Sequence, residues 1–131
     1  MRLLGIDYGR KRVGLALSDE TGRFAFPHSV LSSDKYLLKN ILEICQKEGV
    51  GKIVLGQSLN YRGEPNPIMS KIGKLKRAIE TIGPLEVILE PEFLTSKEAE
   101  RLQGQNEMHD ASAAALILKS YIDRTNHAHL A

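Results

Sequence analysis

The chain has 131 residues, 42% apolar and 26% charged, which is typical of one globular domain with a proper core. Its 18 basic and 16 acidic residues leave a formal charge of +2, so any surface for a polyanion must be local. The one cysteine, Cys45, excludes an internal disulfide and a cysteine-based zinc cluster. No signal peptide precedes the first predicted strand and no apolar run is long enough to span a membrane, so we expect a cytoplasmic protein without a membrane partner.

The first thirty residues predict three antiparallel strands in a meander. Residues 2–8 form the first, and residues 13–17, in which apolar and small side chains alternate, form the second. Polar turns at 8–11 and 19–22 connect the strands. Pro27 interrupts the third, which suits a strand at the edge of the sheet.

Helices and strands alternate after the meander. In chain order, the predicted elements are a helix from Ser33 or Asp34 to Gly49, a strand at 52–56, a helix begun by Asn66-Pro67 and ended by Gly83-Pro84, a strand at 86–90, a short helix from Thr95 to about Leu102 and a last helix from near Asp110. Right-handed crossovers then predict a mixed α/β sheet in the order 3-2-1-4-5. We expect a single domain over residues 1–131, with a loose tail from about residue 124.

An aspartate inside the first predicted strand needs an explanation. An ionised carboxylate is costly to bury unless it is paired, hydrogen-bonded or bound to a metal. Asp7 has three candidate partners: the backbone amides of the following turn, the side chains of Arg10 or Arg12, and a cation. A last helix packed beside the first strand would bring Asp110 toward Asp7, although an aspartate at a helix start is also an ordinary N-cap.

Four motifs in the same order and spacing resemble one known family. They are GIDYGRKRVGLALSD (5–19), VLGQSLNYRG (54–63), LTSKEAE (94–100) and HDASAAALIL (109–118). The chain is similar to the YqgF-type family of Holliday-junction resolvases, also described as nucleases that mature the precursor of 16S ribosomal RNA. That family belongs to the ribonuclease H-like superfamily, so the resemblance implies a ribonuclease H-like sheet with helices on both faces.

The resemblance also implies an activity and a cofactor. It predicts a metal-dependent endonuclease using Mg²⁺ or Mn²⁺, with Asp7, Asp110 and Glu92 as the catalytic and metal-binding carboxylates. The family pattern D-E-R-L-T-[ST] reads PEFLTS here, so Pro91 and Phe93 depart from it while Glu92 keeps the glutamate. Glu90 is a possible substitute for the missing aspartate, because alternate residues of a strand face the same side. The alternative is that both glutamates are surface residues.

Basic and polar residues near these carboxylates are candidates for contact with nucleic acid. Arg12 can bind a phosphate or pair with an acid of the site. His109 is a second-rank proton donor, and an exposed residue before a helix is the simpler interpretation. A homodimer would suit symmetrical cutting of a four-way junction. The predicted nucleic-acid-binding residues are Arg10, Lys11, Arg12, Asn60 and Arg62.

Two other functions remain open from the sequence. The departure at residues 91–93 favours a non-catalytic module that binds nucleic acid or the ribosome. The GIDYG segment also resembles the phosphate loop of actin-like ATPases, but those enclose ATP between two lobes and this chain supplies one.

Overall fold

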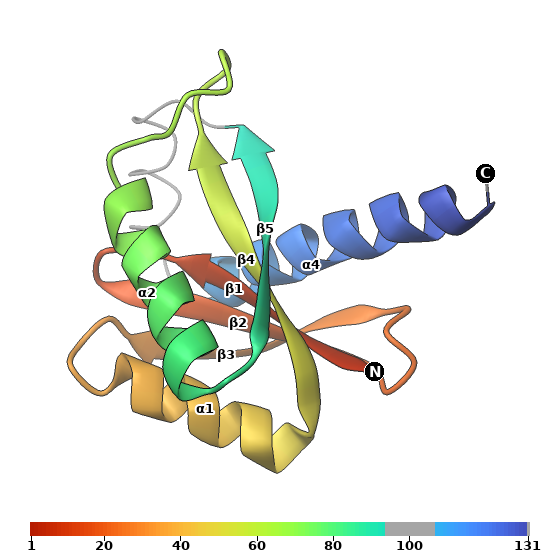
Figure 1. The fold of residues 1–131 in the computed structure, drawn as a ribbon, viewed down its shortest axis with the longest axis horizontal. Helices are drawn as coiled ribbons and strands as arrows, with labels where there is room; N and C mark the ends of the chain where they lie inside the picture. Colours follow the sequence, from red (N-terminus) through yellow and green to blue (C-terminus); the bar gives the residue numbers. More distant parts are fainter. Residues whose placement is uncertain (94–106, 131) are drawn as a thin grey trace.

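A computed structural model describes residues 1–93 and 107–130, with side chains of the last helix described over 110–126 (Figure 1). The elements, in chain order, are β1 (Arg2–Tyr8), β2 (Arg12–Ser18), β3 (Ala25–Ser32), α1 (Leu37–Glu48), β4 (Val50–Leu59), α2 (Met69–Ile82), β5 (Glu86–Phe93) and α4 (Glu107–Leu130). The short helix predicted from Thr95 to about Leu102 lies outside the described residues.

The five strands form one mixed sheet in the order β3-β2-β1-β4-β5, which confirms the predicted topology. β1 pairs with β2 antiparallel and with β4 in parallel, and β5 continues the parallel half. The sheet therefore carries the meander on one side of β1 and the crossover strands on the other. β1 is the central strand, and Asp7 lies near its carboxyl end.

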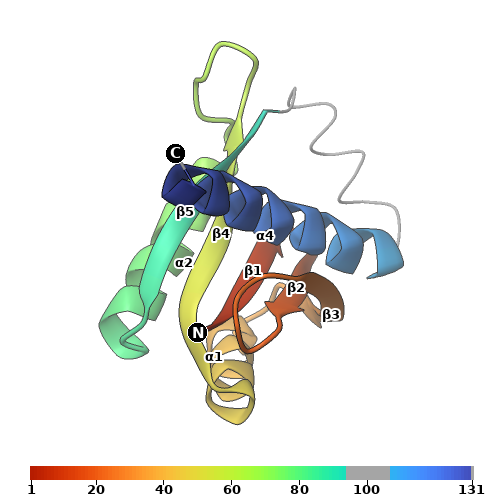
Figure 2. The ribbon, with the colours of Figure 1, turned by 90° about the vertical axis from the view of Figure 1, so that its right-hand side faces the viewer.

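Helices cover both faces of the sheet, and each face has its own apolar core. One core lies under α1 and α2 and contains Ile6, Leu15 and Ile53. The other lies under α4 and contains Val54 and Leu118. Figure 2 shows α4 crossing the strands on the face opposite α1 and α2. The sheet is thus buried on both sides, as expected for strands of near-continuous apolar residues.

The thiol of Cys45 lies in the core under α1, as its helical spacing predicts. Burial raises the pKa of this thiol to about 11, because the thiolate loses its hydration. Cys45 is therefore a packing residue with no nucleophilic character at neutral pH.

The two parallel strands are longer than the sequence predicts. β4 begins at Val50 and ends at Leu59, and β5 continues to Phe93 instead of ending at Glu90. The pairing persists to the partners Ser58 and Glu92. Pro91 is tolerated because β5 is an edge strand, where a missing N–H need not break a ladder. Glu92 consequently projects from a strand and not from a loop.

The last helix begins three residues earlier than predicted. No glycine or proline interrupts residues 107–110, and α4 starts at Glu107, so Asp110 lies in its first turn and not at the N-cap. The positive end of the helix dipole still favours a carboxylate there. α4 runs to Leu130 and includes the residues for which a loose tail is expected. No helix within the described ranges is long and apolar enough to cross a membrane.

Local signals for the other two helices are partly correct. α1 ends at Gly49, whose φ of 66° is the left-handed conformation that favours glycine. Asp34 accepts a hydrogen bond from the Tyr36 amide at 2.9 Å, one turn before the helix proper begins. α2 likewise begins at Met69, after a turn in which the Met69 amide donates to the Asn66 carbonyl at 2.9 Å. The predicted starts mark turns that lead into the helices.

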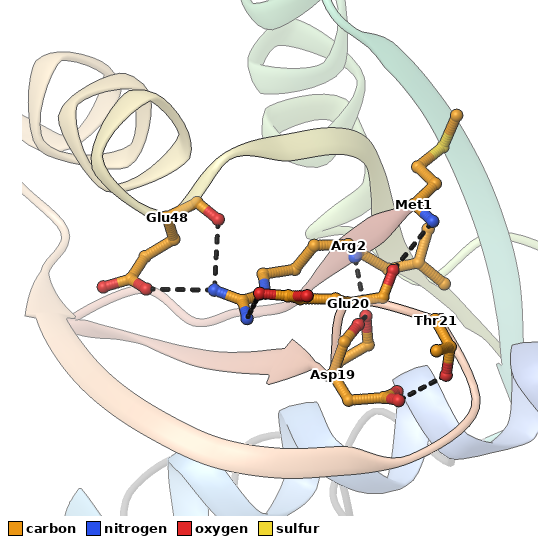
Figure 3. A network of polar contacts seen from close by, with 8 residues as sticks. Met1, Arg2, Asp19, Glu20, Thr21 and Glu48 are labelled. Carbon is orange, nitrogen blue, oxygen red and sulfur yellow. Dashed lines mark hydrogen bonds and ion pairs between the residues drawn. The ribbon is translucent and has the colours of Figure 1, made fainter.

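A polar network fixes the amino end of β1. The Arg2 guanidinium donates to the Glu48 carbonyl at 3.2 Å and lies 3.8 Å from the Glu20 carboxylate (Figure 3). In the same turn Asp19 accepts from Thr21 and, through Oδ1, from the Phe24 amide at 3.0 Å. These hydrogen bonds hold the pKa of Asp19 well below its ordinary value. Asp19, at the end of the first motif, therefore stabilises the turn between β2 and β3.

Candidate active site

The last helix, α4, contacts the sheet at Gly14 of β2, directly beside Asp7 of β1. Asp7 on β1 is paired with Gly14 on β2, and opposite residues of an antiparallel pair point to the same face with Cβ atoms roughly 5 Å apart. A Cβ on Gly14 would lie 1.9 Å from the carbonyl oxygen of Asp110. The backbone of α4 therefore occupies the space of a Gly14 side chain. Asp7 therefore lies on the face of the sheet that α4 covers, and Asp110 lies in the first turn of that helix; the two residues are 9% and 3% exposed.

Arg12 is the basic residue that reaches this pair. It begins β2, and alternation places its side chain on the same face as Gly14. Its Nε lies 2.9 Å from Asp110 Oδ2, and the Arg12 side chain is 29% exposed while that of Asp110 is 4% exposed. Of the two roles predicted for Arg12, pairing with an acid is the one that the structure displays.

Glu92 approaches the same region from β5, across β4. A Cβ on Gly56 would lie 3.6 Å from Glu92 Oε2 and 3.6 Å from the Ile6 carbonyl of β1. The Glu92 carboxylate therefore lies beside Gly56, on the side of the sheet where a Gly56 Cβ would also lie 2.8 Å from Ile117 Cδ1 of α4. Burial raises the pKa of Glu92 above its ordinary value of 4.5, because desolvation penalises the charged form.

Glu90 faces the same side as Glu92 but is engaged elsewhere. The Ser120 hydroxyl donates to Glu90 Oε2 at 2.9 Å, and Arg124 Nη2 donates to Oε1 at 2.6 Å. Glu90 is 4% exposed, so these two partners from α4 compensate its buried charge. Glu90 fastens the carboxyl-terminal half of α4 to the sheet. The shared side of Glu90 and Glu92 is as predicted, but Glu90 is not available as a substitute ligand.

The other predicted nucleic-acid contacts fall into two separate segments. Arg10 and Lys11 are exposed in the turn after Asp7. Asn60 and Arg62 lie in the loop after β4, where Asn60 Oδ1 accepts from the amides of Arg62 and Glu64, each at 2.9 Å. The Asn60 amide group therefore shapes its own loop, while the Arg62 side chain is exposed.

The donor chemistry of the site suits a hard cation, although the set is small. Carboxylate oxygens are the ligands that Mg²⁺ and Mn²⁺ prefer. Among residues 1–93 and the described part of α4, no three ligating side chains lie close enough together to hold an ion by themselves. Asp7, Asp110 and Glu92 are the residues whose carboxylates best suit a divalent cation. The side chain of His109 lies outside the described residues.

Two residues of this site were not singled out from the sequence. Gly14 and Gly56 carry no chemistry, but they allow α4 to approach the sheet, through the Asp110 backbone at Gly14 and the Ile117 side chain at Gly56. A glycine in the interior of a strand is a recognised signal of close backbone approach, and it is the signal that could have found both. The Glu90 contacts could not be foreseen, because Ser120 and Arg124 belong to no motif.

Known proteins resemble the chain over nearly all its length. The family model described as "RuvX: Holliday junction resolvase" matches residues 1–124. A protein of Syntrophomonas wolfei subsp. wolfei named "Putative pre-16S rRNA nuclease" is 37% identical over 133 residues, covering 94% of this chain and 94% of the relative. A protein of Endomicrobium trichonymphae with the same name is 35% identical, covering 93% and 95%.

Solved structures support the fold. RuvC of T. thermophilus, in complex with a Holliday junction substrate, matches with a TM-score of 0.61 at 16% identity, over 95% of this chain and 94% of that one. The Fowlpox virus resolvase, in complex with Holliday junction DNA, matches with a TM-score of 0.56 at 13% identity, over 95% and 99%. These likenesses establish the ribonuclease H-like architecture. Together with the family match and the relatives, they show that this chain belongs to the RuvX family of Holliday junction resolvases.

Proposed function

We propose that this protein is a metal-dependent endonuclease that hydrolyses phosphodiester bonds in structured nucleic acid. The observation that supports the proposal is that the backbone of Asp110 lies against Gly14, the strand partner of Asp7, so that two buried acidic residues from opposite ends of the sequence share this part of the sheet. Two buried carboxylates held near each other repel, and a cation relieves the repulsion. Family membership supports the same activity.

Asp7 and Asp110 would hold Mg²⁺ or Mn²⁺, with Glu92 as the third carboxylate. Such an ion activates water and stabilises charge on the phosphate oxygens. Because the described residues provide no complete set of three ligands, a phosphate of the substrate would complete the coordination. Dependence of metal affinity on substrate is therefore a property that we expect of this site.

Glu92 suits proton transfer as well as ligation. Its raised pKa brings the carboxyl closer to neutral pH than an exposed glutamate, which favours exchange of a proton with water at the scissile phosphate. Arg10 and Lys11 would contact the backbone phosphates beside the site, since they are exposed in the turn that follows Asp7. Arg62 would contact a more distant part of the substrate from the loop after β4.

The substrates to test come from the relatives and the family. Curated relatives are named for precursor 16S rRNA, and the family model for the Holliday junction. Both are structured polyanions, and the observed site does not discriminate between them. We propose structured RNA or branched DNA as the substrate class, with action in the cytoplasm.

The decisive experiment measures cleavage of both substrates with Mn²⁺ or Mg²⁺. Asp7→Asn and Asp110→Asn keep the size of each side chain and should each abolish cleavage. Asp123→Asn is the matched control, because Asp123 pairs with Lys119 on an exposed part of α4. Cleavage by the Asp7→Asn protein at the wild-type rate would contradict the proposal.

The second candidate function is a non-catalytic module that binds nucleic acid or the ribosome. It is favoured by the incomplete ligand set and by Pro91 and Phe93, which depart from the family pattern. The same experiment separates the two functions. Binding of the substrates with equal background cleavage in the wild type and in Asp7→Asn would establish the binding module.

Symmetrical incision of a junction needs two sites, so we also propose a homodimer. The mass in solution, measured by light scattering with and without a four-way junction, tests it. A monomer that nevertheless cuts both strands at equal rates would contradict the dimer.

A further inference from the structure

We propose that Arg12 is the resident counter-charge of Asp110 and that it competes with the divalent cation for this carboxylate. The inference rests on the proposed function, because it concerns the same site. It assigns to Arg12 a positioning and regulatory role in metal loading, in addition to any contact with nucleic acid.

The first step is the position of the guanidinium. Arg12 Nε lies 2.9 Å from Asp110 Oδ2, on a carboxylate that is almost completely buried. A buried carboxylate requires compensation, and Arg12 supplies a full positive charge at contact distance. A cation bound by Asp110 would supply the same charge at the same group.

The second step is that both positive charges cannot be held at this carboxylate without cost. A guanidinium has no lone pair to offer a metal, so Arg12 can only repel an ion beside it. The N–H of Arg12 is close to Asp110 Oδ2 but is not aligned with it as in a hydrogen bond. The contact is therefore mainly a charge pair, which a doubly charged ion is well suited to replace.

The third step is that the Arg12 side chain can move away from Asp110. Its backbone is fixed at the start of β2 by pairing with Ser32, but its side chain is 29% exposed. A displaced guanidinium would swing toward Arg10 and Lys11, in the exposed turn. There it could bind a phosphate of the substrate, so binding of the metal and of nucleic acid would reinforce each other.

A purely structural pair makes the opposite prediction. If Arg12 only held Asp110 in place for the ion, removing it would loosen a ligand and weaken metal binding. If it competes, removing it strengthens metal binding while it destabilises the metal-free protein. The sign of the change in metal affinity therefore separates the two roles.

The test is calorimetric titration of Mn²⁺ into the wild type, Arg12→Gln, Arg12→Lys and Arg23→Gln, each in the presence of dimethyl phosphate, a phosphodiester that supplies the oxygens assigned to the substrate. We expect Arg12→Gln to bind Mn²⁺ about tenfold more tightly, equivalent to about 1.4 kcal/mol. We also expect its metal-free melting temperature to fall and its stabilisation by saturating Mn²⁺ to exceed that of the wild type. Arg12→Lys keeps the charge and should stay within about threefold of the wild type. Arg23→Gln removes the same charge from an exposed side chain in the β2–β3 turn and should change the affinity less than twofold.

A second measurement needs no variant that might fold poorly. The Nε–H signal of Arg12 in the ¹⁵N spectrum of the wild type should move toward that of a free arginine as Mg²⁺ saturates the site. Equal or weaker Mn²⁺ binding by folded Arg12→Gln, or an Arg12 signal that Mg²⁺ leaves unchanged, would overturn the inference. Absence of Mn²⁺ binding by the wild type, with and without substrate, would instead refute the proposed function.

Discussion

Replacing Gly14 with alanine should separate α4 from the sheet at the candidate site. The new Cβ would lie 1.9 Å from the Asp110 carbonyl oxygen and 3.0 Å from the Ala111 amide nitrogen, both of them backbone atoms that cannot rotate away. Cβ contacts shorter than 3.0 Å are essentially never found, so the helix must shift by about 1 Å or more. Asp110 would move with it, because it lies at the point of contact.

The expected cost follows from this geometry. Overpacking of a well-packed core costs about 1–3 kcal/mol, and a clash between two backbones belongs at the upper end. In a domain of this size we expect the melting temperature to fall by about 10 °C. A displacement of about 1 Å at a reacting centre also reduces turnover by roughly 100-fold.

The assay combines urea unfolding with the cleavage experiment, and Gly51→Ala is the matched control. A Cβ on Gly51 would lie 2.7 Å from Met1 Cγ, the flexible part of a side chain that can move, so this control should lose less than about 1 kcal/mol. If Gly14→Ala is as stable as Gly51→Ala and cleaves at the wild-type rate, the contact between β2 and α4 does not position the site.

Four further results are expected. Gly56→Ala should lower stability, because its Cβ would lie 2.8 Å from Ile117 Cδ1 in the core under α4, whereas its 3.6 Å distance from Glu92 Oε2 is an ordinary contact; urea unfolding measures the loss. Glu92→Gln should match the wild type in stability below pH 4.5 and exceed it at higher pH, since a raised pKa means that ionising Glu92 disfavours the folded state; melting curves across pH test the divergence. Arg124→Met should lower the free energy of unfolding by about 1–2 kcal/mol, measured with urea, because it leaves the buried Glu90 with one partner fewer. The loss is smaller than in a fully buried pair, because Arg124 itself is half exposed. Asp19→Ala should destabilise the protein at neutral pH, and the difference should shrink as the pH falls below 3.8. The reason is that the hydrogen bonds that lower the pKa of Asp19 stabilise the fold only while the carboxylate is ionised. Thermal melting curves at pH 7 and pH 3 test this.

The topology was predictable from the sequence because its signals are local and repeated. Alternation in residues 13–17, the change to helical spacing and the glycine at residue 49 each specify one element, and right-handed crossovers then allow one strand order. The residues at which β4 and β5 end could not be predicted in the same way. The pairing of Ser58 with Glu92 depends on a neighbouring strand, and that information is not local.

The sequence proposes the residues of the candidate site, and the structure adds contacts that the sequence does not specify. Asp7 stood out because an acid interrupts an apolar strand, and the motifs pointed to Asp110. The partner of Arg12 was left open between phosphate and carboxylate, because both have the same charge. The occupation of Glu90 by Ser120 and Arg124 depends on the rotation of α4 about its axis, which a sequence pattern specifies only coarsely.

The meeting of β2 and α4 at Gly14 has a consequence for biosynthesis. Asp7 leaves the ribosome early, but its partner carboxylate follows only after more than a hundred residues have been joined. A nascent or prematurely terminated chain that ends before Asp110 lacks half of the acidic pair. If the protein cuts ribosomal RNA precursors, its own synthesis brings it beside ribosomal RNA in an inert form, and it gains the capacity to cut only when translation of the chain is nearly finished.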